Sequence, residues 1–255
     1  MKRKGVTTKS VTTKGVTARS VKAKSVTAKR VTTKAKAKRA PIEPLDDVRV
    51  RGGRVYDKLT AEYPDAHCEL DFKNPFQLIV ATILSAQCTD RRVNMVTPVL
   101  FSRYPSPVTL ARAKQEDVER IIQSTGFFRN KAKNLIAMSR ALVDHYGSEV
   151  PAKLEDLVTL PGVGRKTGNV VLGNAFRIDE GVVVDTHIAR LSLRLGFTKA
   201  TDPLKIEQDL IGLFPRERWT MLAHLLIWHG RRVCDARKPR HKACAVAHLC
   251  PSRNI

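Results

Sequence analysis

The stretch of sequence that decides the fold reads Leu160-Pro161-Gly162-Val163-Gly164-Arg165-Lys166-Thr167-Gly168-Asn169-Val170-Val171. Pro161 ends any helix before it, because proline disfavours the helical conformation in the residue that precedes it. Gly162 and Gly164 allow a tight turn and the close approach of a second backbone. A new segment with helical apolar spacing begins at Arg165. The pattern predicts two short helices joined by a glycine-rich turn, where the free N–H groups of the second helix form an anion site.

A helical hairpin with a glycine-rich corner needs no ligand, and short glycine motifs arise by chance, so a purely structural interpretation stays open. The basic pair Arg165-Lys166 follows the turn directly. A cation in the first turn of a helix is locally unfavourable, because the helix dipole is positive there. The pair therefore indicates that Lys166 serves a partner or takes part in chemistry.

The composition points to a polyanionic partner. The chain has 255 residues, enough for one large or two small domains, and 42% of them are hydrophobic. The formal net charge is +22; residues 1–40 hold 14 of the cations and no acidic residue, which leaves +8 for residues 41–255. No run approaches the roughly 18 apolar residues that span a bilayer, and the N-terminus lacks the apolar core of a signal peptide.

Residues 5–34 repeat a five-residue unit that begins as Gly5-Val6-Thr7-Thr8-Lys9. A period of five matches neither a helix nor a strand, and one valine in five residues buries too little to offset the entropy of ordering. We therefore expect residues 1–44 to be a disordered Lys-rich tail. The charge favours salt-sensitive contacts with phosphates regardless of sequence, and a tail without a role or a transit peptide are the alternatives.

The remaining sequence predicts an all-α protein. Asn74-Pro75 is typical of an N-cap followed by proline at the first helical position, and Gly147 is typical of a helix stop. Val182-Val183-Val184 has no strand-like partner and is expected to be an extended loop. A helix over 48–63 should be broken at Gly52-Gly53. Further helices are expected at 75–84, 91–103, 107–112, 115–123, 129–146, 153–159, 165–176, 187–195, 203–214 and 217–230.

Several separated motifs occur in an order that resembles one known family. They are Leu84-Ser85-Ala86-Gln87-Cys88-Thr89-Asp90, Gly126-Phe127-Phe128-Arg129-Asn130-Lys131-Ala132, the Leu160–Asp185 stretch and Cys234-Asp235-Ala236-Arg237-Lys238-Pro239-Arg240. Together they resemble the endonuclease III family of helix-hairpin-helix DNA glycosylases with AP lyase activity, over roughly Val50 to Ser252. Motifs that agree in order are far more specific than any one of them alone.

The resemblance implies the helix-hairpin-helix DNA glycosylase fold, with two helical domains and the active site in the cleft between them. Residues 67–180 would form a barrel-like bundle that contains the hairpin. Residues 45–66 and 181–255 would form the second domain, with a metal-cluster loop near the C-terminus. The expected partner is double-stranded DNA with a damaged base or an abasic site. Nothing suggests a membrane or an oligomer, so we expect a monomer.

The resemblance also assigns the chemistry, with Lys166 as the nucleophile and Asp185 as an essential carboxylate. An enzyme that cuts the bond between base and sugar must first flip the nucleotide out of the duplex, and an amine can then attack C1′ to form a Schiff base. The amine must be neutral to attack, which a helix N-terminus and desolvation favour. Asp185 would take up a proton and stabilise positive charge on the sugar. Alternatively, Lys166 contacts a phosphate and Asp185 caps the next helix.

By the same resemblance, Gln87 and Phe127 insert into the duplex where the base has left. The family commonly has leucine in place of Phe127, and an aromatic ring can stack on bases. One of Phe127 and Phe128 should instead belong to the core. Asp90 would lie near the lesion pocket, and His187 is expected to make a structural hydrogen bond. The expected phosphate contacts are Gly162, Gly164 and Arg165.

The C-terminal segment carries a metal-ligand pattern. The family spaces four cysteines as C-x6-C-x2-C-x5-C around a 4Fe-4S cluster, whereas this chain keeps the spacing with Cys234, His241, Cys244 and Cys250. Histidine ligates some iron–sulfur clusters, so we expect a cluster with His241 as a ligand; Zn²⁺ or no metal are the alternatives. A metal would hold the basic residues of this loop toward phosphates, namely Arg237, Lys238, Arg240 and Lys242. Cys68 and Cys88 are expected to be ordinary buried thiols.

We therefore predict a bifunctional DNA glycosylase/AP lyase of base excision repair that excises oxidised pyrimidines and cleaves the strand by β-elimination. A monofunctional adenine-specific glycosylase of the same superfamily lacks the hairpin lysine, so Lys166 argues against it. A non-catalytic DNA-binding or architectural protein is the alternative from another class. Five cysteines without a secreted disulfide pattern indicate a reducing compartment, here the bacterial cytoplasm with its nucleoid.

Overall fold

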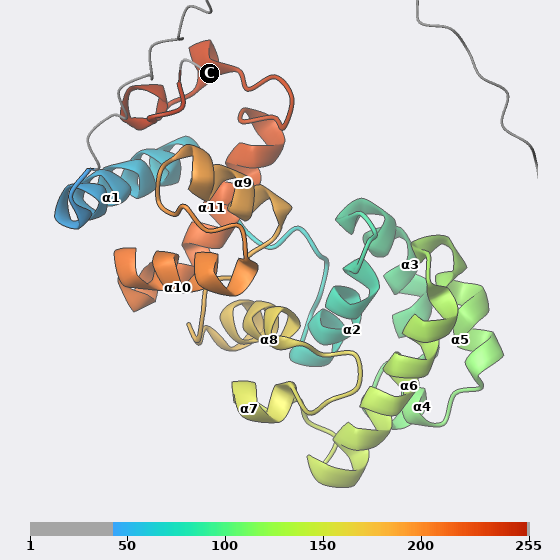
Figure 1. Cartoon of the computed structure of the whole chain (residues 1–255). Helices are drawn as coiled ribbons and strands as arrows, with labels where there is room; N and C mark the ends of the chain where they lie inside the picture. The colour runs from blue at the N-terminus through green and yellow to red at the C-terminus, as the bar shows by residue number, and fades with distance from the viewer. Residues whose placement is uncertain (1–42, 254–255) are drawn as a thin grey trace, which may run out of the picture. The chain divides into compact units, whose positions relative to one another are not determined.

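The computed structural model describes residues 43–253, and every regular element in that range is a helix. The eleven α-helices of this range are shown in Figure 1. They are α1 (Leu45–Glu62), α2 (Pro75–Ser85), α3 (Asp90–Arg103), α4 (Pro107–Ala111), α5 (Gln115–Ile122), α6 (Phe128–His145), α7 (Leu154–Leu157), α8 (Arg165–Val171), α9 (Thr186–Arg194), α10 (Pro203–Leu213) and α11 (Trp219–Arg232). The all-α prediction is confirmed. None of these helices is long and apolar enough to cross a membrane.

Local signals in the sequence place the helix ends. The side chain of Asn74 accepts a hydrogen bond from the Gln77 N–H at 2.9 Å, and Pro75 starts α2. This arrangement satisfies one of the free N–H groups at the helix start. At the end of α6 the chain turns at Gly147 with φ of 57°, and the Ser148 N–H reaches the Leu142 carbonyl at 2.9 Å. Both ends agree with the sequence-based prediction, because capping depends on near neighbours only.

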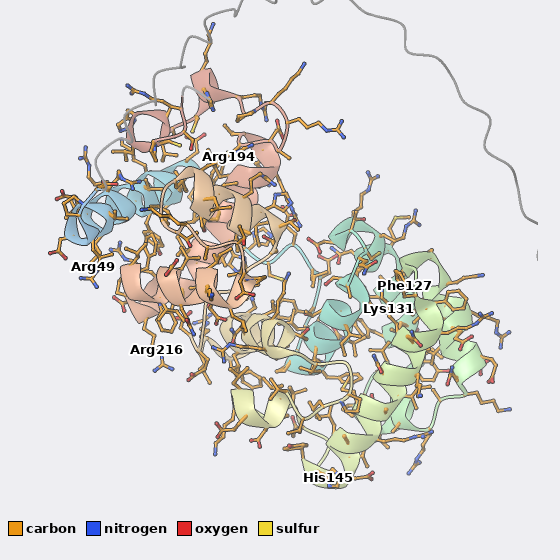
Figure 2. All side chains as sticks on the ribbon, viewed as in Figure 1. Arg49, Phe127, Lys131, His145, Arg194 and Arg216 are labelled. Atoms are coloured by element: carbon orange, nitrogen blue, oxygen red, sulfur yellow. The ribbon has the colours of Figure 1, made fainter. Side chains whose placement is uncertain are left out.

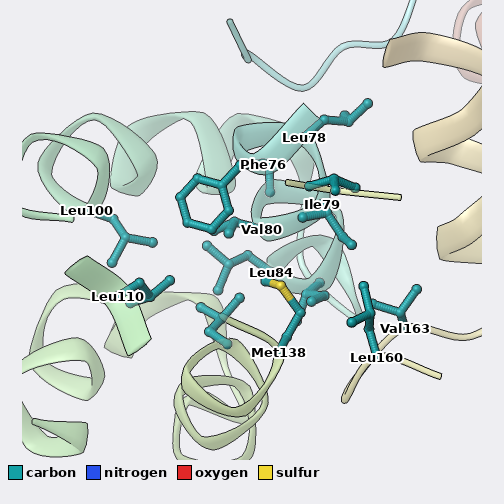
Figure 3. Close-up of a cluster of buried hydrophobic side chains, with 14 of the residues drawn as sticks. Phe76, Leu78, Ile79, Val80, Leu84, Leu100, Leu110, Met138, Leu160 and Val163 are labelled. Atoms are coloured by element: carbon teal, nitrogen blue, oxygen red, sulfur yellow. The ribbon is translucent and has the colours of Figure 1, made fainter. Parts of the chain in front are cut away.

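The first hydrophobic core surrounds α2. Nearly the whole of this helix is buried, from Phe76 to Leu84. A helix that is apolar on all sides belongs at the centre of a core. Figure 3 shows its side chains against Leu100, Leu110 and Met138, which come from α3, α4 and α6. Leu160 and Val163 from the hairpin pack on the same cluster, so the core positions the hairpin.

A second hydrophobic core joins helices from the two ends of the described chain. It contains Val55 and Leu59 of α1 together with apolar residues of α9, α10 and α11. Val182 belongs to it, and Val183 and Val184 pack against it from a loop without regular structure, so the loop prediction is confirmed. The two clusters share no residue. The buried residues of the first lie within 70–172, and those of the second lie within 48–66 and 182–249. Whether each is a domain of its own, with the boundaries given above, stays a prediction.

The predicted break at Gly52-Gly53 does not occur, because α1 runs through both glycines without interruption. Gly52 is buried, and a Cβ atom added to it would lie 3.2 Å from the Phe214 ring. Glycine at this position therefore allows close helix packing rather than a turn. The prediction was wrong because local sequence does not distinguish two uses of glycine. One ends a helix, and the other lets a second helix pack closely against the first. The prediction for the tail, residues 1–44, lies outside the described residues except for Glu43 and Pro44.

Polar side chains connect the two cores. His224 of α11 lies 2.8 Å from the Asn174 side chain through its Nε2 atom. The Thr220 N–H donates to the Asp179 carboxylate at 2.9 Å. Arg165 of α8 donates from Nε and Nη2 to both carboxylate oxygens of Glu207 on α10, each at 3.1 Å. These contacts hold α8 and the segment after it against α10 and α11.

The buried state of His224 predicts an acid-sensitive step in stability. Burial, aided by nearby His67, lowers the pKa of His224 to about 4, whereas histidine in an unfolded chain titrates near about 6.5. The unfolded chain therefore takes up the proton at higher pH, and the stability from neutral His224 is lost as the pH falls from about 6.5 to 4. We expect His224→Gln, which keeps an N–H donor for Asn174, to reduce this loss by up to about 3 kcal/mol. Urea unfolding at pH 7 and pH 4.5 measures it. An equal reduction in the exposed-site control His145→Gln would contradict the assignment.

Candidate active site and metal loop

The hairpin turn between α7 and α8 depends on glycine at one position and leaves open space at another. Gly162 has φ of +80°, and a Cβ atom added there would lie 2.9 Å from Cβ of Asn134. Other residues are therefore strained at this position. Gly164 is the N-cap of α8 with φ of −93° and ψ of 173°, and nothing lies within 4 Å of an added Cβ atom. The turn therefore presents an open backbone surface at the start of α8.

Lys166 is exposed in the first turn of α8 and lines a cleft of about 540 Å³. Asp185 lines the same cleft from the start of α9. The size is within the range of ligand sites, roughly 300 to 1,000 Å³. Residues from both hydrophobic cores surround the cleft, and the sequence-predicted residues found together there are Lys166, Asp185, Gln87, Asp90 and His187.

The carboxylate of Asp185 is held by the helix that it begins. Its Oδ1 atom accepts a hydrogen bond from the Ile188 N–H at 2.8 Å, so the capping interpretation is confirmed. A cap of this kind restricts the side chain, which fixes the carboxylate at the edge of the cleft. His187 makes the structural contact expected of it, with Nδ1 3.2 Å from Nη2 of Arg190. Burial lowers the pKa of His187 despite the nearby Asp185 carboxylate.

Arg231 is a cleft residue that the sequence analysis missed. Its Nη2 atom donates to Oδ2 of Asp90 at 2.8 Å, and Nη1 donates to Glu69. The guanidinium thus connects the last turn of α11 with the first turn of α3. A basic residue in the last turn of a helix was the only local signal, and it indicates dipole complementarity rather than a partner. Asp90 is therefore in an ion pair at the rim of the predicted lesion pocket.

The two residues predicted to insert into DNA are exposed and have left-handed backbone. Gln87 has φ of 53° and follows α2, while Phe127 has φ of 47° and precedes α6. Such values are uncommon outside glycine. The side chain of Phe127 is 63% exposed, whereas Phe128 packs against the first core. The prediction that one of the two phenylalanines belongs to the core is confirmed.

Arg165 has a protein partner. Its guanidinium makes two hydrogen bonds to Glu207, whose side chain is 8% exposed. The same carboxylate also accepts a hydrogen bond from the Asn169 side chain at 3.2 Å. A paired arrangement of this kind is geometrically specific and strong. Gly181 passes so close that an added Cβ atom would collide with Glu207. The contact of Arg165 with DNA stays a prediction.

The predicted metal ligands line one cavity. Cys234 follows α11, His241 begins a short 3-10 helix (His241–Ala243), and Cys244 and Cys250 complete the set. Buried His229 joins them, with Nε2 3.4 Å from the Cys244 sulfur. Burial raises the pKa of the Cys244 and Cys250 thiols, and neighbouring thiols add to the effect. Within residues 43–253, no three His, Cys, Asp or Glu side chains lie close enough together to hold one metal ion.

Two arginines of α9, which sequence reasoning missed, hold the metal loop. Arg190 donates to the carbonyls of Gly230 and Cys234 at 3.0 and 3.1 Å. Arg194 lies 3.2 Å from the Cys234 sulfur and donates to the Asp235 and Ala236 carbonyls, each at 2.7 Å. Figure 2 labels Arg194 beside this loop. The predicted basic residues of the loop are exposed, namely Arg237, Lys238, Arg240 and Lys242.

Cys68 and Cys88 differ from expectation. Both are half-buried and line the cleft. The prediction that they are fully buried was therefore wrong. Each lies where the chain enters or leaves the region of α2, at the edge of the first core rather than inside it. Burial raises the pKa of the Cys68 thiol.

Comparison with known proteins places this geometry in a family. Residues 80–216 match the family model of the HhH-GPD superfamily of base excision DNA repair proteins. The chain is 58% identical to Endonuclease III of Synechocystis sp. over 190 residues, which cover 74% of this chain and 87% of the relative. It is 45% identical to Endonuclease III of Bacillus subtilis over 195 residues, 76% of this chain and 89% of the relative.

Solved structures agree with the sequence relatives. The structure of a non-covalent Endonuclease III–DNA complex matches with a TM-score of 0.76 and 42% identity, covering 80% of this chain and 96% of the other. A trapped Endonuclease III–DNA covalent intermediate matches equally well. A thermostable thymine-DNA glycosylase, at 21% identity and a TM-score of 0.71, shares the fold. The glycine-rich hairpin, the cleft and the C-terminal cysteine loop thus occur in a chain that belongs to the endonuclease III family of base excision DNA repair proteins.

Proposed function

We propose that the cleft is the active site of a DNA glycosylase/AP lyase in which Lys166 is the nucleophile and Asp185 the assisting carboxylate. The observation that carries this assignment is that an exposed lysine and a helix-capped aspartate line one cleft beside an open glycine-rich turn. A solved structure of a related Endonuclease III shows a trapped covalent intermediate with DNA. A nucleophile that can form a covalent adduct is what Lys166 offers.

The reaction begins when the neutral Nζ atom of Lys166 attacks C1′ of a flipped nucleotide. A bond forms between Nζ and C1′, and the bond between C1′ and the base breaks, so its electron pair leaves with the base. Nζ then gives up a proton, the bond between C1′ and O4′ breaks, and O4′ takes up a proton to become a hydroxyl, which leaves a Schiff base between Nζ and C1′. Loss of a proton from C2′ then expels the 3′ phosphate by β-elimination, which is the lyase step. Each step needs only the amine and a group that moves protons.

Asp185 supplies that proton-moving group and a negative charge. Because Oδ1 is held by the α9 backbone, the carboxylate stays in one place while charge develops on the sugar. A fixed carboxylate stabilises a cationic sugar without reorganising during the reaction. Asp185 can also accept the proton that Lys166 loses. The cap and the catalytic role are compatible, since one carboxylate has several acceptor positions.

DNA would be held at three places around the cleft. A Cβ atom added to Gly164 would meet open space at the start of α8, so a phosphate can approach the backbone there. Gln87 and Phe127 would occupy the duplex where the base has flipped out, because both are exposed on tight loops. Arg237, Lys238 and Arg240 would contact phosphates further along, with a share of affinity that falls with salt.

The C-terminal loop would hold an iron–sulfur cluster through Cys234, His241, Cys244 and Cys250. Three thiols and an imidazole around one cavity fit the donors that such clusters use. When bound, the cluster would supply electron-transfer capability and crosslink the loop. The chain's own Arg190 and Arg194 brace the loop through its backbone carbonyls.

The proposed substrate class is oxidised or ring-saturated pyrimidine in double-stranded DNA, handled by one copy of the chain in a reducing cytoplasm. A cleft that receives a single flipped base fits this class. The alternative, a DNA-binding protein without catalysis, requires no lysine in the cleft. The exposure of Lys166 beside Asp185 favours the enzyme.

Replacing the nucleophile tests the enzyme against the alternative. We expect wild-type protein with borohydride to give a covalent band on duplex DNA that carries one abasic site or one thymine glycol. Lys166→Gln should give none, because an amide forms no Schiff base. Lys153→Gln, at the exposed N-cap of the preceding helix α7, is the matched control and should trap normally. Binding of both DNAs by wild type without trapping or cleavage would instead support the architectural protein.

Substitutions at the two turn glycines should have different effects, one mainly on stability and the other mainly on DNA affinity. Gly162→Ala should lower the free energy of unfolding by about 1–3 kcal/mol, because its φ is positive and Asn134 blocks the side chain. Gly164→Ala should change stability by less than about 1 kcal/mol, since alanine tolerates its backbone angles. It should nevertheless weaken DNA binding, because the methyl group points where a phosphate would lie. Urea unfolding and fluorescence anisotropy measure the two effects. Unchanged affinity in Gly164→Ala would remove this turn from the interface.

The histidine ligand should make the cluster more labile. A neutral imidazole in place of a thiolate leaves the donor set one charge more positive, which raises the reduction potential. We expect His241→Cys protein to keep its visible absorbance longer in air than wild type. His248→Cys adds a thiol to the same loop outside the predicted ligand set and is the control. Equal bleaching of wild type and His241→Cys would argue against His241 as a ligand.

A further inference from the structure

Lys131 is a buried cation that neither core requires. It lies in the first turn of α6 with 5% exposure, and no carboxylate among the described residues pairs with it. Its Nζ atom donates instead to two backbone carbonyls, Leu84 at 2.8 Å and Thr125 at 2.9 Å. Figure 2 labels Lys131 close to Phe127. The ammonium therefore connects two chain segments that are far apart in sequence.

Both carbonyls lie at the ends of helices. Leu84 is in the last turn of α2, and Thr125 is the last residue of a short 3-10 helix (Gln123–Thr125). Carbonyls at a helix end have no partner within the helix and carry partial negative charge. A cation between two such ends satisfies the hydrogen bonds of both and meets favourable dipoles from each. This explains how a charge without a carboxylate partner is tolerated inside the protein.

Each of the segments that leave these two ends carries an exposed residue with left-handed backbone. Gln87 comes three residues after Leu84, and Phe127 comes two residues after Thr125. The backbone N–H of Lys131 also donates to the Phe127 carbonyl at 3.1 Å. Strained backbone of this kind persists only where its surroundings hold it. Lys131 hydrogen-bonds to the chain shortly before each strained residue, at Leu84 and at Thr125. Its side chain therefore connects the two segments that lead into these loops.

An apolar residue at position 131 would fill the core at lower cost, because a buried charge loses its hydration. Burial accordingly lowers the pKa of Lys131, with the nearby Cys88 thiol acting in the opposite direction. Most of its buried α6 neighbours are apolar, among them Ala132 and Leu135, and Lys131 is the only charged residue on the buried face of this helix. A costly buried charge at this position indicates a gain beyond packing.

We propose that Lys131 is a positioning residue that sets the spacing of the two loops that insert into DNA, so that Gln87 and Phe127 enter the duplex together. This inference rests on the proposed function, which assigns insertion to these loops. Lys131 is not among the residues that line the cleft. Its effect should therefore be confined to substrates that must be opened, because a single strand has no partner strand to hold apart.

The test compares two DNAs that carry the same abasic site, one double-stranded and one single-stranded. Lys131→Met keeps the length and apolar stem but removes the N–H donors. We expect single-turnover borohydride trapping on the duplex to slow by at least about tenfold, since a misplacement of about 1 Å can cost up to about a hundredfold. Trapping on the single strand should remain within about twofold of wild type. The exposed Lys133→Met on the same helix should behave as wild type on both DNAs.

A double variant shows whether Lys131 acts through the inserted loops. If it does, Lys131→Met combined with Phe127→Ala should be little slower on the duplex than Phe127→Ala alone, because coupled residues are not additive. Fluorescence of 2-aminopurine opposite the abasic site should show reduced unstacking in both single variants. Additive losses, or equal slowing on duplex and single strand, would overturn the proposal.

A failure of the proposed function and a folding defect can each be distinguished from a failure of the Lys131 proposal. If wild-type protein traps neither DNA, the proposed function fails rather than the role of Lys131. If Lys131→Met does not fold, Lys131→Arg replaces it, because guanidinium keeps the charge and donors but its longer planar group alters the spacing. The same duplex-selective loss is expected of Lys131→Arg, and equal slowing on both DNAs would again reject the proposal.

Discussion

The buried carboxylate of Glu207 is the constraint on which the arrangement of the site depends. It receives two hydrogen bonds from Arg165 and one from Asn169, and Gly181 packs directly against it. Arg165 and Asn169 belong to α8, the helix that carries Lys166. Removing one partner of a buried ion pair is costly, because the other charge is then left without compensation. The pair thus fixes α8 relative to α10.

The same contact also directs the chain toward the second site residue. Gly181 passes Glu207 at close range, and four residues later Asp185 begins α9. Lys166 and Asp185 therefore reach the cleft from segments that are both anchored at one carboxylate. Arg165 looks like a DNA contact in the sequence, yet in the fold its guanidinium holds the hairpin in place. A charged residue next to a nucleophile can serve the site by binding the protein itself.

Helix α9 extends this organisation from the cleft to the metal loop. Its first residues are capped by Asp185, and its last turn carries Arg194, which contacts the carbonyls and sulfur around Cys234. Arg190 between them reaches Gly230 and Cys234. One nine-residue helix thus relates the Asp185 carboxylate to the loop whose basic residues face solvent. Any order that a cluster imposes on the loop would be transmitted to phosphate contacts through a short, rigid element.

Three locally unfavourable features are linked to the loops that are expected to meet DNA. Gln87 and Phe127 have left-handed backbone, Phe127 is an exposed aromatic ring, and the buried charge of Lys131 bonds to the segments that lead into both loops. Proteins depart from local rules mainly where function requires it. The link through Lys131 thus gives these two departures a common structural support.

The sequence alone determined the all-α class, most helix ends and the loop at Val182–Val184. It also singled out Lys166 and Asp185, which line one cleft. These features depend on neighbours within one or two turns, such as Asn74 capping α2. Only the tertiary structure decided that Gly52 allows packing against Phe214, that Arg165 binds Glu207, and that Arg231 and Lys131 connect distant segments. Their partners lie far away along the chain, and local sequence carries no information about which distant group a charge or a small residue will meet.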